Sequence, residues 1–437
     1  MNQALVVLLS LMLSSQAAES ERTRLIDRAL QNNPLIGAAR ASMQEFEALY
    51  TKAKLSWLPR TRVEALGSAT PAITYEENTD MDLSKWGPLA SFEATMAMPL
   101  YTFGKLRLLK EMAVSGIDIG KARIKMARDE IRFQVNTAYF SNLHSRRLLD
   151  IIEDGKDKLE KARSYLAEHE EDEDFDQVDL LRLKVYDAKT RIQEFEAGRL
   201  KLISHTALSM LTGLDSALSQ ESLSTRVPAI KETVTVAGLL EKAKQNRPEV
   251  QALELASRLA GIETSLENRK WFPDILAVAS FNWRKAWAID ISQNSGYNPY
   301  DTIFGGGGVG LVWNLDFGER IGNIDKTRAK QRRLTFQTNA LLLKIEIAIA
   351  QKLQLARDAC EITKLNKKAK RAARSWASSK SALYEAGTGD LKETIEALTK
   401  YFGIAVDVEN SVLKSNLAMS ALARECGITI EDLIGLE

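Results

Sequence analysis

The sequence has few of the residues that usually mark a catalytic, metal-binding or disulfide-rich protein. Its 437 residues include two cysteines, Cys360 and Cys426, and three histidines, His144, His169 and His205. The cysteine spacing matches no metal motif, so we interpret both as idle thiols on helices, with a disulfide between them as the alternative. No histidine lies near a convincing nucleophile or ligand partner, and we interpret all three as surface residues. The sequence therefore predicts no enzyme, no metal site and no cofactor.

An excess of charge of either sign is also lacking. The chain has 59 basic and 58 acidic residues, a formal net charge of +1. A nucleic-acid-binding domain is usually strongly basic, so we expect no nucleic-acid partner. Glycine and proline number only 24 and 9, too few for a disordered chain, and 45% of the residues are hydrophobic. The composition favours a folded protein with a substantial core.

Long apolar runs are absent as well. Residues 4–13 are apolar apart from Ser10, and Ser15 and Ala17 supply the small residues of a cleavage site, so we predict a signal peptide over residues 1–17. The alternative, an N-terminal anchor helix, needs a run of about 20 apolar residues. No second run of such length follows. If the exported chain spans a membrane, it must do so as a β-barrel. An open sheet or a loop would leave backbone polar groups unpaired in lipid.

An internal duplication is the main positive feature. Residues 25–34 match residues 239–248 at an offset of 214, and four further landmarks share that offset. They are Trp57-Leu58-Pro59 with Trp271-Phe272-Pro273, Phe103-Gly104 with Phe317-Gly318, Ile131 with Ile345, and Gly213 with Gly427. We therefore predict a first structural repeat over residues 22–213, an equatorial linker over 214–235, a second repeat over 236–427 and a C-terminal tail over 428–437.

Each repeat begins with a helix and continues with two strand-like segments. We expect the first helix over residues 21–56, ended by Pro59. Residues 62–66, 91–100, 275–284 and 308–315 alternate with period two, as strands of a membrane barrel do. Tryptophan concentrates at membrane–water boundaries, and we predict this location for Trp57, Trp86, Trp271, Trp283, Trp287 and Trp313. Ordinary aromatic content of strands is the alternative.

A long helical hairpin completes each repeat. Residues 105–167 contain no proline and, at about 1.5 Å per residue, reach roughly 90 Å, too long for a globular core. Spacings of three and four predict a coiled-coil seam on each return helix. The seam residues are Val178, Leu181, Val185, Ala188, Ile192 and Phe195 in the first repeat and Leu391, Ile395, Leu398, Phe402 and Ala405 in the second.

The order of these elements resembles the TolC-like outer-membrane efflux protein family over essentially the whole mature chain. The local signatures are Asn32-Asn33-Pro34, Asn246-Arg247-Pro248-Glu249-Val250, Pro99-Leu100-Tyr101-Thr102-Phe103-Gly104, Leu315-Asp316-Phe317-Gly318 and the tip at residues 384–391. The resemblance implies a mixed α and β membrane protein. Its long antiparallel coiled-coil helices would form an α-barrel, and each protomer would give four strands to a transmembrane β-barrel of twelve strands in a trimer.

The resemblance also implies a function and partners. It implies an outer-membrane channel, with a large periplasmic portion, of a multi-component efflux or secretion system in a Gram-negative-type bacterium. Such a channel passively conducts substrate delivered by an inner-membrane pump. The expected partners are two further copies in a homotrimer, a periplasmic adaptor (membrane fusion) protein, an inner-membrane transporter and outer-membrane lipid. The main alternative is a periplasmic coiled-coil adaptor or scaffold without a barrel, which usually has one hairpin rather than two.

The resemblance places adaptor docking and gating at the hairpin tips. In the second repeat the tip residues are Gly387, Thr388, Gly389, Asp390 and Leu391. We expect Gly387 to make the turn at positive φ and Leu391 to open the return helix and help dock the adaptor. A turn without a partner is the alternative.

The first tip departs from the family pattern because it is strongly acidic. Its carboxylates are Glu168, Glu170, Glu171, Asp172, Glu173, Asp174 and Asp176. A solvated charge run is one interpretation. Another is an acidic collar that favours cations at the end of a tunnel, and a third is a contact with a basic adaptor tip.

Overall fold

The computed structural model describes residues 21–75, 79–168, 177–214, 230, 233–290, 300–386 and 388–435. The predicted signal peptide lies outside these residues, as does most of the predicted linker. The chain divides into two compact units. The helical unit comprises the described residues up to 41 and those within 121–252 and 337–437, and the sheet unit comprises the described residues within 42–120 and 253–336. The fold is mostly helical with a single sheet.

The first helix of each repeat is interrupted rather than continuous. A helix over residues 21–32 is followed by α2 (Pro34–Lys54), and α5 (Val236–Asn246) is followed by α6 (Pro248–Arg269). Proline has no N–H to continue a helical ladder, but it is well suited to the first position of a new helix. The side chain of Asn33 caps α2 by accepting a hydrogen bond from the N–H of Leu35 at 2.9 Å. The prediction of one helix over residues 21–56 was therefore wrong.

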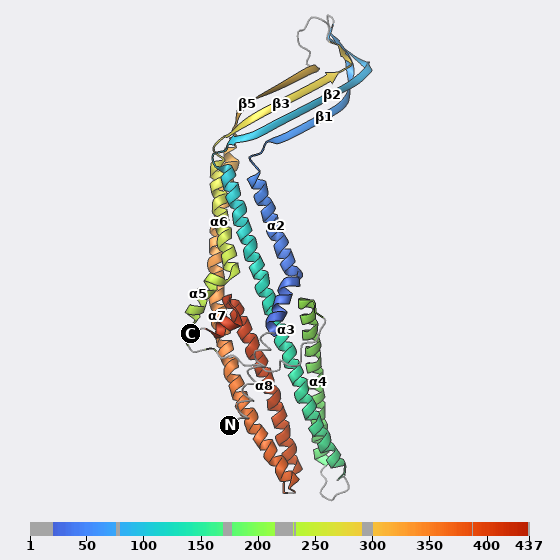
Figure 1. Cartoon of the computed structure of the whole chain (residues 1–437), viewed down its shortest axis with the longest axis vertical. Helices are drawn as coiled ribbons and strands as arrows, with labels where there is room; N and C mark the ends of the chain where they lie inside the picture. Colours follow the sequence, from blue (N-terminus) through green and yellow to red (C-terminus); the bar gives the residue numbers. More distant parts are fainter. Residues whose placement is uncertain are drawn as a thin grey trace. The chain divides into compact units, whose positions relative to one another are not determined.

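The sheet contains four long strands and one short one. They are β1 (Arg60–Tyr75), β2 (Thr79–Tyr101), β3 (Asp274–Ala286), β4 (Ile289–Asp290) and β5 (Asp301–Val312), in the order β4-β1-β2-β3-β5. All neighbours are antiparallel except β1 and β4. Figure 1 shows the four long strands side by side. All four predicted segments lie in strands, but β5 ends at Val312, so Trp313 and Leu315 lie beyond it.

Four long helices follow the strand pairs. They are α3 (Lys105–Glu168), α4 (Gln177–Thr212), α7 (Phe317–Glu385) and α8 (Leu391–Cys426), and the short α9 (Ile430–Ile434) ends the described chain. With 64 residues in α3 and 69 in α7, the prediction of very long helices is confirmed. Within the described residues, no helix combines the length and apolar character needed to cross a bilayer.

Residues separated by the 214-residue offset play the same part in the core of the helical unit. The two largest clusters of buried side chains form most of this core. The buried members related by the offset are Leu25, Ala29, Ile131 and Val135 in one cluster and Leu239, Ala243, Ile345 and Ile349 in the other. Gly213 and Gly427 both follow a helix in the left-handed conformation, at φ of 68° and 66°. The boundaries of the two repeats stay a prediction.

The two predicted seams have opposite surroundings. On α8, Ile395 and Ala405 are buried, as a packed seam requires. On α4 the seam residues are exposed, up to 79% for Phe195. The apolar α4 residues buried within the unit are instead Leu183, Ala197 and Leu208, on another face. The packing prediction is confirmed for α8, whereas the α4 seam has no cover within the described protomer and its packing stays a prediction, because spacing reveals an apolar face but not the partner that covers it.

Candidate functional site

The register of the sheet sorts its side chains into two unlike faces. Directly paired residues lie on the same face, and Ala94 pairs with both Val63 and Phe281. The face that carries Val63, Ala94 and Phe281 has no charged residue between Ile303 and Leu311 on β5. The residues paired with this stretch on the other strands are uncharged as well. This face carries Val63, Ala65, Phe92, Ala94, Met96, Met98, Ile275, Ala277, Ala279, Phe281, Trp283, Ile303, Val309 and Leu311.

The opposite face carries most of the charged and polar side chains of the strands. They are Arg60, Arg62, Glu64, Ser91, Glu93, Thr95, Ser280, Asn282 and Arg284. Arg62 forms an ion pair with Glu64 on this face. Strand β5 stands at one end of the sheet order, and β1 is followed at the other end only by the two residues of β4. The sheet therefore has one apolar face, one polar face and two open edges.

Charged pairs bound the uncharged stretch of the apolar face. Lys285 forms an ion pair with Asp301 at 3.2 Å. These two residues are directly paired, and they are the next pair on this face after Trp283 and Ile303. At the helix-proximal end, Lys105 forms an ion pair with Asp274 at 2.9 Å and donates to the carbonyl of Phe272 at 2.7 Å. On β3 the stretch between these pairs runs from Ile275 to Trp283, within the nine to eleven residues with which a tilted strand crosses a bilayer.

The predicted boundary tryptophans lie at both ends of the strands. Trp57, Trp271 and Trp313 lie where strands meet helices, whereas Trp86 and Trp287 lie near the other end, with Trp283 on β3. Trp313 donates its indole N–H to the carbonyl of Trp271 at 3.0 Å. The guanidinium of Arg320 lies 5.7 Å from the ring centre of Trp271, within cation–π range. The membrane-boundary role of these residues stays a prediction.

The exposed apolar stripe of α4 is the second candidate surface. Its large side chains are Val178, Leu181, Val185, Ile192 and Phe195, and each is between 47% and 79% exposed. Leu202, Ile203 and Met210 continue the exposed apolar surface toward the end of α4. A contiguous apolar surface of this kind usually marks a protein–protein contact.

The tip between α7 and α8 is compact where it is described. Asp390 caps α8 by accepting a hydrogen bond from the N–H of Lys392 at 2.9 Å, and α8 begins at Leu391. The N–H of Thr388 donates to the carbonyl of Leu383 at 3.1 Å. A Cβ on Gly389 would lie 2.6 Å from the backbone nitrogen of Tyr384, so only glycine fits this approach. Gly387 lies outside the described residues.

The acidic first tip also falls outside the described chain. Helix α3 ends at Glu168, and residues 169–176, which carry the other six carboxylates, are not described. The three interpretations of this run remain predictions.

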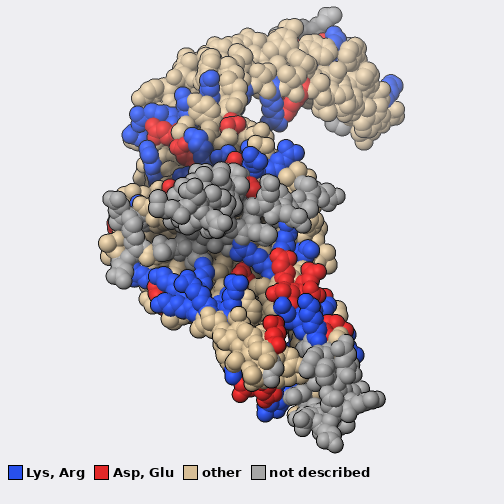
Figure 2. All heavy atoms as spheres, turned by 60° about the horizontal axis from the view of Figure 1, so that its bottom comes forward, with Lys and Arg blue, Asp and Glu red and all other residues tan. Residues whose placement is uncertain are grey.

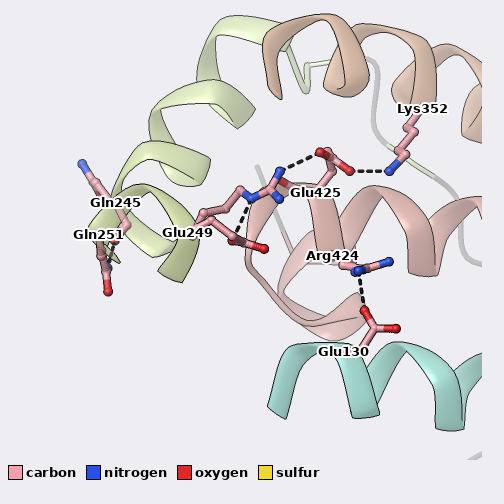
Figure 3. A network of polar contacts seen from close by, with 8 residues as sticks. Glu130, Gln245, Glu249, Gln251, Lys352, Arg424 and Glu425 are labelled. Atoms are coloured by element: carbon pink, nitrogen blue, oxygen red, sulfur yellow. Dashed lines mark hydrogen bonds and ion pairs between the residues drawn. The ribbon is translucent and has the colours of Figure 1, made fainter. Parts of the chain in front are cut away.

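A polar network that the sequence reasoning missed holds the break between α5 and α6. Arg247 donates from Nη1 to Glu425 at 2.6 Å and from Nε to Glu249 at 3.2 Å. Lys352 of α7 forms an ion pair with the same Glu425, and Figure 3 shows these side chains directed toward each other. Burial raises the pKa of Glu425, but the hydrogen bond from Lys352 and the charge of Arg247 outweigh it, so the pKa lies below its usual value. Only the Arg247-Pro248-Glu249 signature hinted at this network.

A second contact in Figure 3 joins α8 to α3. Arg424 forms an ion pair with Glu130, and its guanidinium lies 4.7 Å from the ring centre of Phe133. The two contacts together connect three long helices of the helical unit near the end of α8.

One histidine contradicts the surface interpretation. His144 is only 6% exposed between α3 and α8, beside a small cavity also lined by Phe140, Arg147 and Glu409. Burial lowers the pKa of His144, although the nearby Glu409 carboxylate opposes that effect. Its Nδ1 is buried without a hydrogen-bond partner among the described residues. Sequence spacing failed because residues 144 and 409 are far apart in the chain.

The other candidate groups for chemistry are unreactive or unclustered. Cys360 and Cys426 are both buried and not joined by a disulfide, and the Sγ of Cys360 lies 3.3 Å from the Oγ of Ser415. Burial raises the pKa of the Cys426 thiol to about 12, which suppresses the reactive thiolate at neutral pH. The described part of the chain has no group of three or more His, Cys, Asp or Glu residues that could hold a metal ion.

Comparison with known proteins agrees with this architecture. The model of the outer membrane efflux protein family matches residues 25–171. No curated protein matches the chain. The fold is shared with solved outer membrane channels, and the resemblance to the TolC-like family read from the sequence is thereby confirmed.

Three solved structures illustrate the shared fold. The outer membrane channel CmeC of Campylobacter jejuni aligns over 93% of this chain and 85% of its own, with a TM-score of 0.73 and 14% identity. The outer membrane protein VceC of Vibrio cholerae aligns over 95% and 98%, with a TM-score of 0.71 and 16% identity. The open state of the MtrE outer membrane channel of Neisseria gonorrhoeae aligns over 93% and 89%, with a TM-score of 0.74 and 15% identity.

Proposed function

We propose that this chain is one protomer of a homotrimeric outer-membrane channel that passively conducts substrate in an efflux or secretion system. The observation that carries the proposal is the sheet with one uncharged apolar face, one polar face and two open edges. In lipid such a sheet must close, because unpaired backbone groups at an edge are costly there. Three copies of the four long strands would close it as a barrel of twelve strands.

The dimensions of the apolar face support this assignment. From Ile303 to Val312, about ten residues along β5 correspond to roughly 33 Å of strand. With the usual barrel tilt of about 40°, that length covers an apolar band roughly 25 Å tall. The apolar face would meet lipid, and the face with Arg62, Glu64 and Glu93 would line a water-filled lumen.

The exposed stripe on α4 supports the trimer from the helical side. A helix that leaves Val185, Ile192 and Phe195 in water loses much of the stability that burial of those side chains supplies. A neighbouring copy in a ring of three would cover the stripe. The helices of the three copies would then form the wall of a periplasmic tunnel.

The tips are the proposed periplasmic end. We assign Thr388, Gly389, Asp390 and Leu391, together with Gly387, to the docking of an adaptor. An inner-membrane transporter would supply the energy, so the channel itself would only open and close. The acidic residues 168–176 would stand at the entrance and favour cations.

Single-channel recording of the purified protein in planar bilayers tests the proposal. We expect stable conductance steps, and a trimer that resists dissociation in mild detergent until it is heated. A trimer that inserts but stays silent until divalent cations are removed would indicate a closed gate. A soluble monomer without conductance would overturn the proposal in favour of a periplasmic scaffold.

A further inference from the structure

A groove within the helical unit has no part in the proposed conduction path. It lies between α3, α4 and α8 and has a volume of about 190 Å³. Its apolar lining includes Ile152, Leu159, Leu183, Ile395, Leu398 and Phe402. An apolar cavity of about 150 Å³ is enough to hold a benzene ring, so this groove has room for a ring or a short alkyl chain.

The charges at the groove are all of one sign. Lys158 of α3 and Lys189 of α4 are the only charged residues of its lining, which includes no carboxylate. Both ammonium-bearing side chains are exposed, and within the described chain neither forms an ion pair. Lys156, only two residues from Lys158, instead pairs with Glu194 across the two helices at 3.0 Å. The groove thus combines an apolar floor with two cations available to an anion.

We propose that this groove binds a medium-chain carboxylate. The carboxylate would lie between the Lys158 and Lys189 side chains, and the alkyl chain would pack on Leu398 and Phe402. Two cations flanking an apolar surface select an anionic amphiphile over a cationic one, because the charged head is attracted in one case and repelled in the other. A bound molecule would connect the hairpin of α3 and α4 to α8 of the other hairpin.

The proposed trimer contact leaves the groove accessible. At 100° per residue, the apolar α4 side chains that line the groove lie roughly 140° around the helix from the exposed stripe, and Lys189 lies between them, about 50° from Val185 and Ile192. Leu183, Tyr186 and Thr190 belong to the groove, whereas Val185 and Ile192 belong to the stripe. A copy that covers the stripe therefore covers a different face of α4. The proposal concerns one protomer and does not depend on conduction.

Calorimetric titration of the purified protein with octanoate tests the proposal, with the detergent alone as background. We expect one site per protomer for octanoate, weaker binding of octanol and no binding of octylamine. Added salt should weaken the binding of octanoate and leave the binding of octanol unchanged, because salt screens only the charged carboxylate. Failure of octanoate to bind, or equal binding of octylamine, would overturn the proposal.

Two variants with matched changes locate the site. Lys158→Gln with Lys189→Gln should weaken octanoate about tenfold, as expected for the loss of two ion pairs at an exposed rim. Lys161→Gln with Lys184→Gln removes the same charge from the same helices outside the groove and should leave affinity unchanged. Equal weakening by both pairs would mean that general charge, not the groove, attracts the anion.

A third variant fills the groove itself. A Cβ on Gly403 would meet nothing within 4 Å, and leucine is a better helix former than glycine, so Gly403→Leu is compatible with folding. It should abolish octanoate binding while the circular dichroism spectrum and the oligomeric state stay as in the parent protein. Undiminished binding by a folded Gly403→Leu protein would exclude this groove.

Discussion

Two titratable side chains in the helical unit show how surroundings set the behaviour of a residue. Burial keeps His144 neutral, with a pKa below the usual 6.5, whereas Lys352 and Arg247 keep Glu425 ionised, with a pKa below the usual 4.5. In both cases the unfolded chain takes up a proton more readily than the folded chain as the pH falls. The contribution of His144 to the free energy of unfolding therefore declines as the pH falls below 6.5. The contribution of Glu425 declines only below pH 4.5.

The pH window of His144 gives the first prediction. His144→Gln should flatten the loss of thermal stability between pH 7.5 and pH 5.5, because glutamine cannot take up the proton that destabilises the parent protein. Thermal unfolding followed by circular dichroism at several pH values measures this. His205→Gln, at a half-buried position on α4, serves as the control. Identical pH slopes for the parent protein and His144→Gln would show that His144 does not determine the decline.

The network around Arg247 gives the second prediction. Arg247→Met leaves Glu425 with one partner fewer in a largely buried site, and we expect a loss of about 2 kcal/mol in the free energy of unfolding. Lys242→Met, on the exposed side of α5, should change it by less than about 0.5 kcal/mol. Urea unfolding of the helices measures both. A double variant with Glu425→Gln should lose less than the sum of the single losses, and additive losses would argue against a direct coupling.

At the scale of elements, α4 and α8 have similar spacing of apolar residues but differ in whether those residues are buried. The stripe on α8 is buried within the unit, and the stripe on α4 faces away from it. The duplication therefore preserves the helical pattern while the two copies of the return helix take different neighbours. No described residue of the protomer buries the α4 stripe, which is the expected property of a surface that assembly covers.

The third prediction follows from that surface. Ile192→Glu places a carboxylate at the middle of the stripe and should shift the protein from trimer to monomer, because burying the charge in the contact is costly. Lys201→Glu places a carboxylate at an exposed position on the opposite side of α4 and should keep the trimer. Light scattering coupled to size-exclusion chromatography measures the mass. A trimer of normal yield from Ile192→Glu would mean that this stripe is not the subunit contact.

At the scale of the whole molecule, the distribution of charge separates strands from helices. In the view of Figure 2, most of the sheet surface is uncharged, and Lys, Arg, Asp and Glu gather over the helices. A chain with nearly equal numbers of acids and bases can still carry strong local fields. In a threefold assembly, every such group occurs three times around one axis.

The fourth prediction concerns the acidic residues at the first tip. Replacing Glu168, Glu170, Glu171, Asp172, Glu173, Asp174 and Asp176 by their amides should lower the ratio of cation to anion permeability several-fold, because the carboxylates would no longer repel anions. Reversal potentials in a salt gradient measure the ratio. Amide replacement of the exposed Glu153, Asp154, Asp157 and Glu160 on α3 is the control and should change the ratio much less. If selectivity is unchanged without the acidic side chains of the tip, they are a solvated charge run and do not select ions.

Much of the local structure could be predicted from the residues because it depends on local rules. Alternation of apolar and polar residues is a property of strands, and a proline-free apolar period of seven is a property of long helices. These rules located the four long strands and the four long helices but not the two-residue strand β4. They misplaced the break at Asn33, where Pro34 starts a new helix, and the end of β5, which stops one residue before Trp313.

The sequence by itself determined the duplicated plan, the two faces of the strands and the apolar stripes of the return helices, because each depends on spacing along the chain. Only the tertiary structure decided which stripe is buried, that His144 is enclosed, that Arg247 meets Glu425 and that Lys158 and Lys189 flank one groove. Each of these properties depends on contacts between residues that are distant in sequence, or on which face of a helix is covered. Packing decides them, since burial depends on which partner lies opposite and not on the period of the pattern.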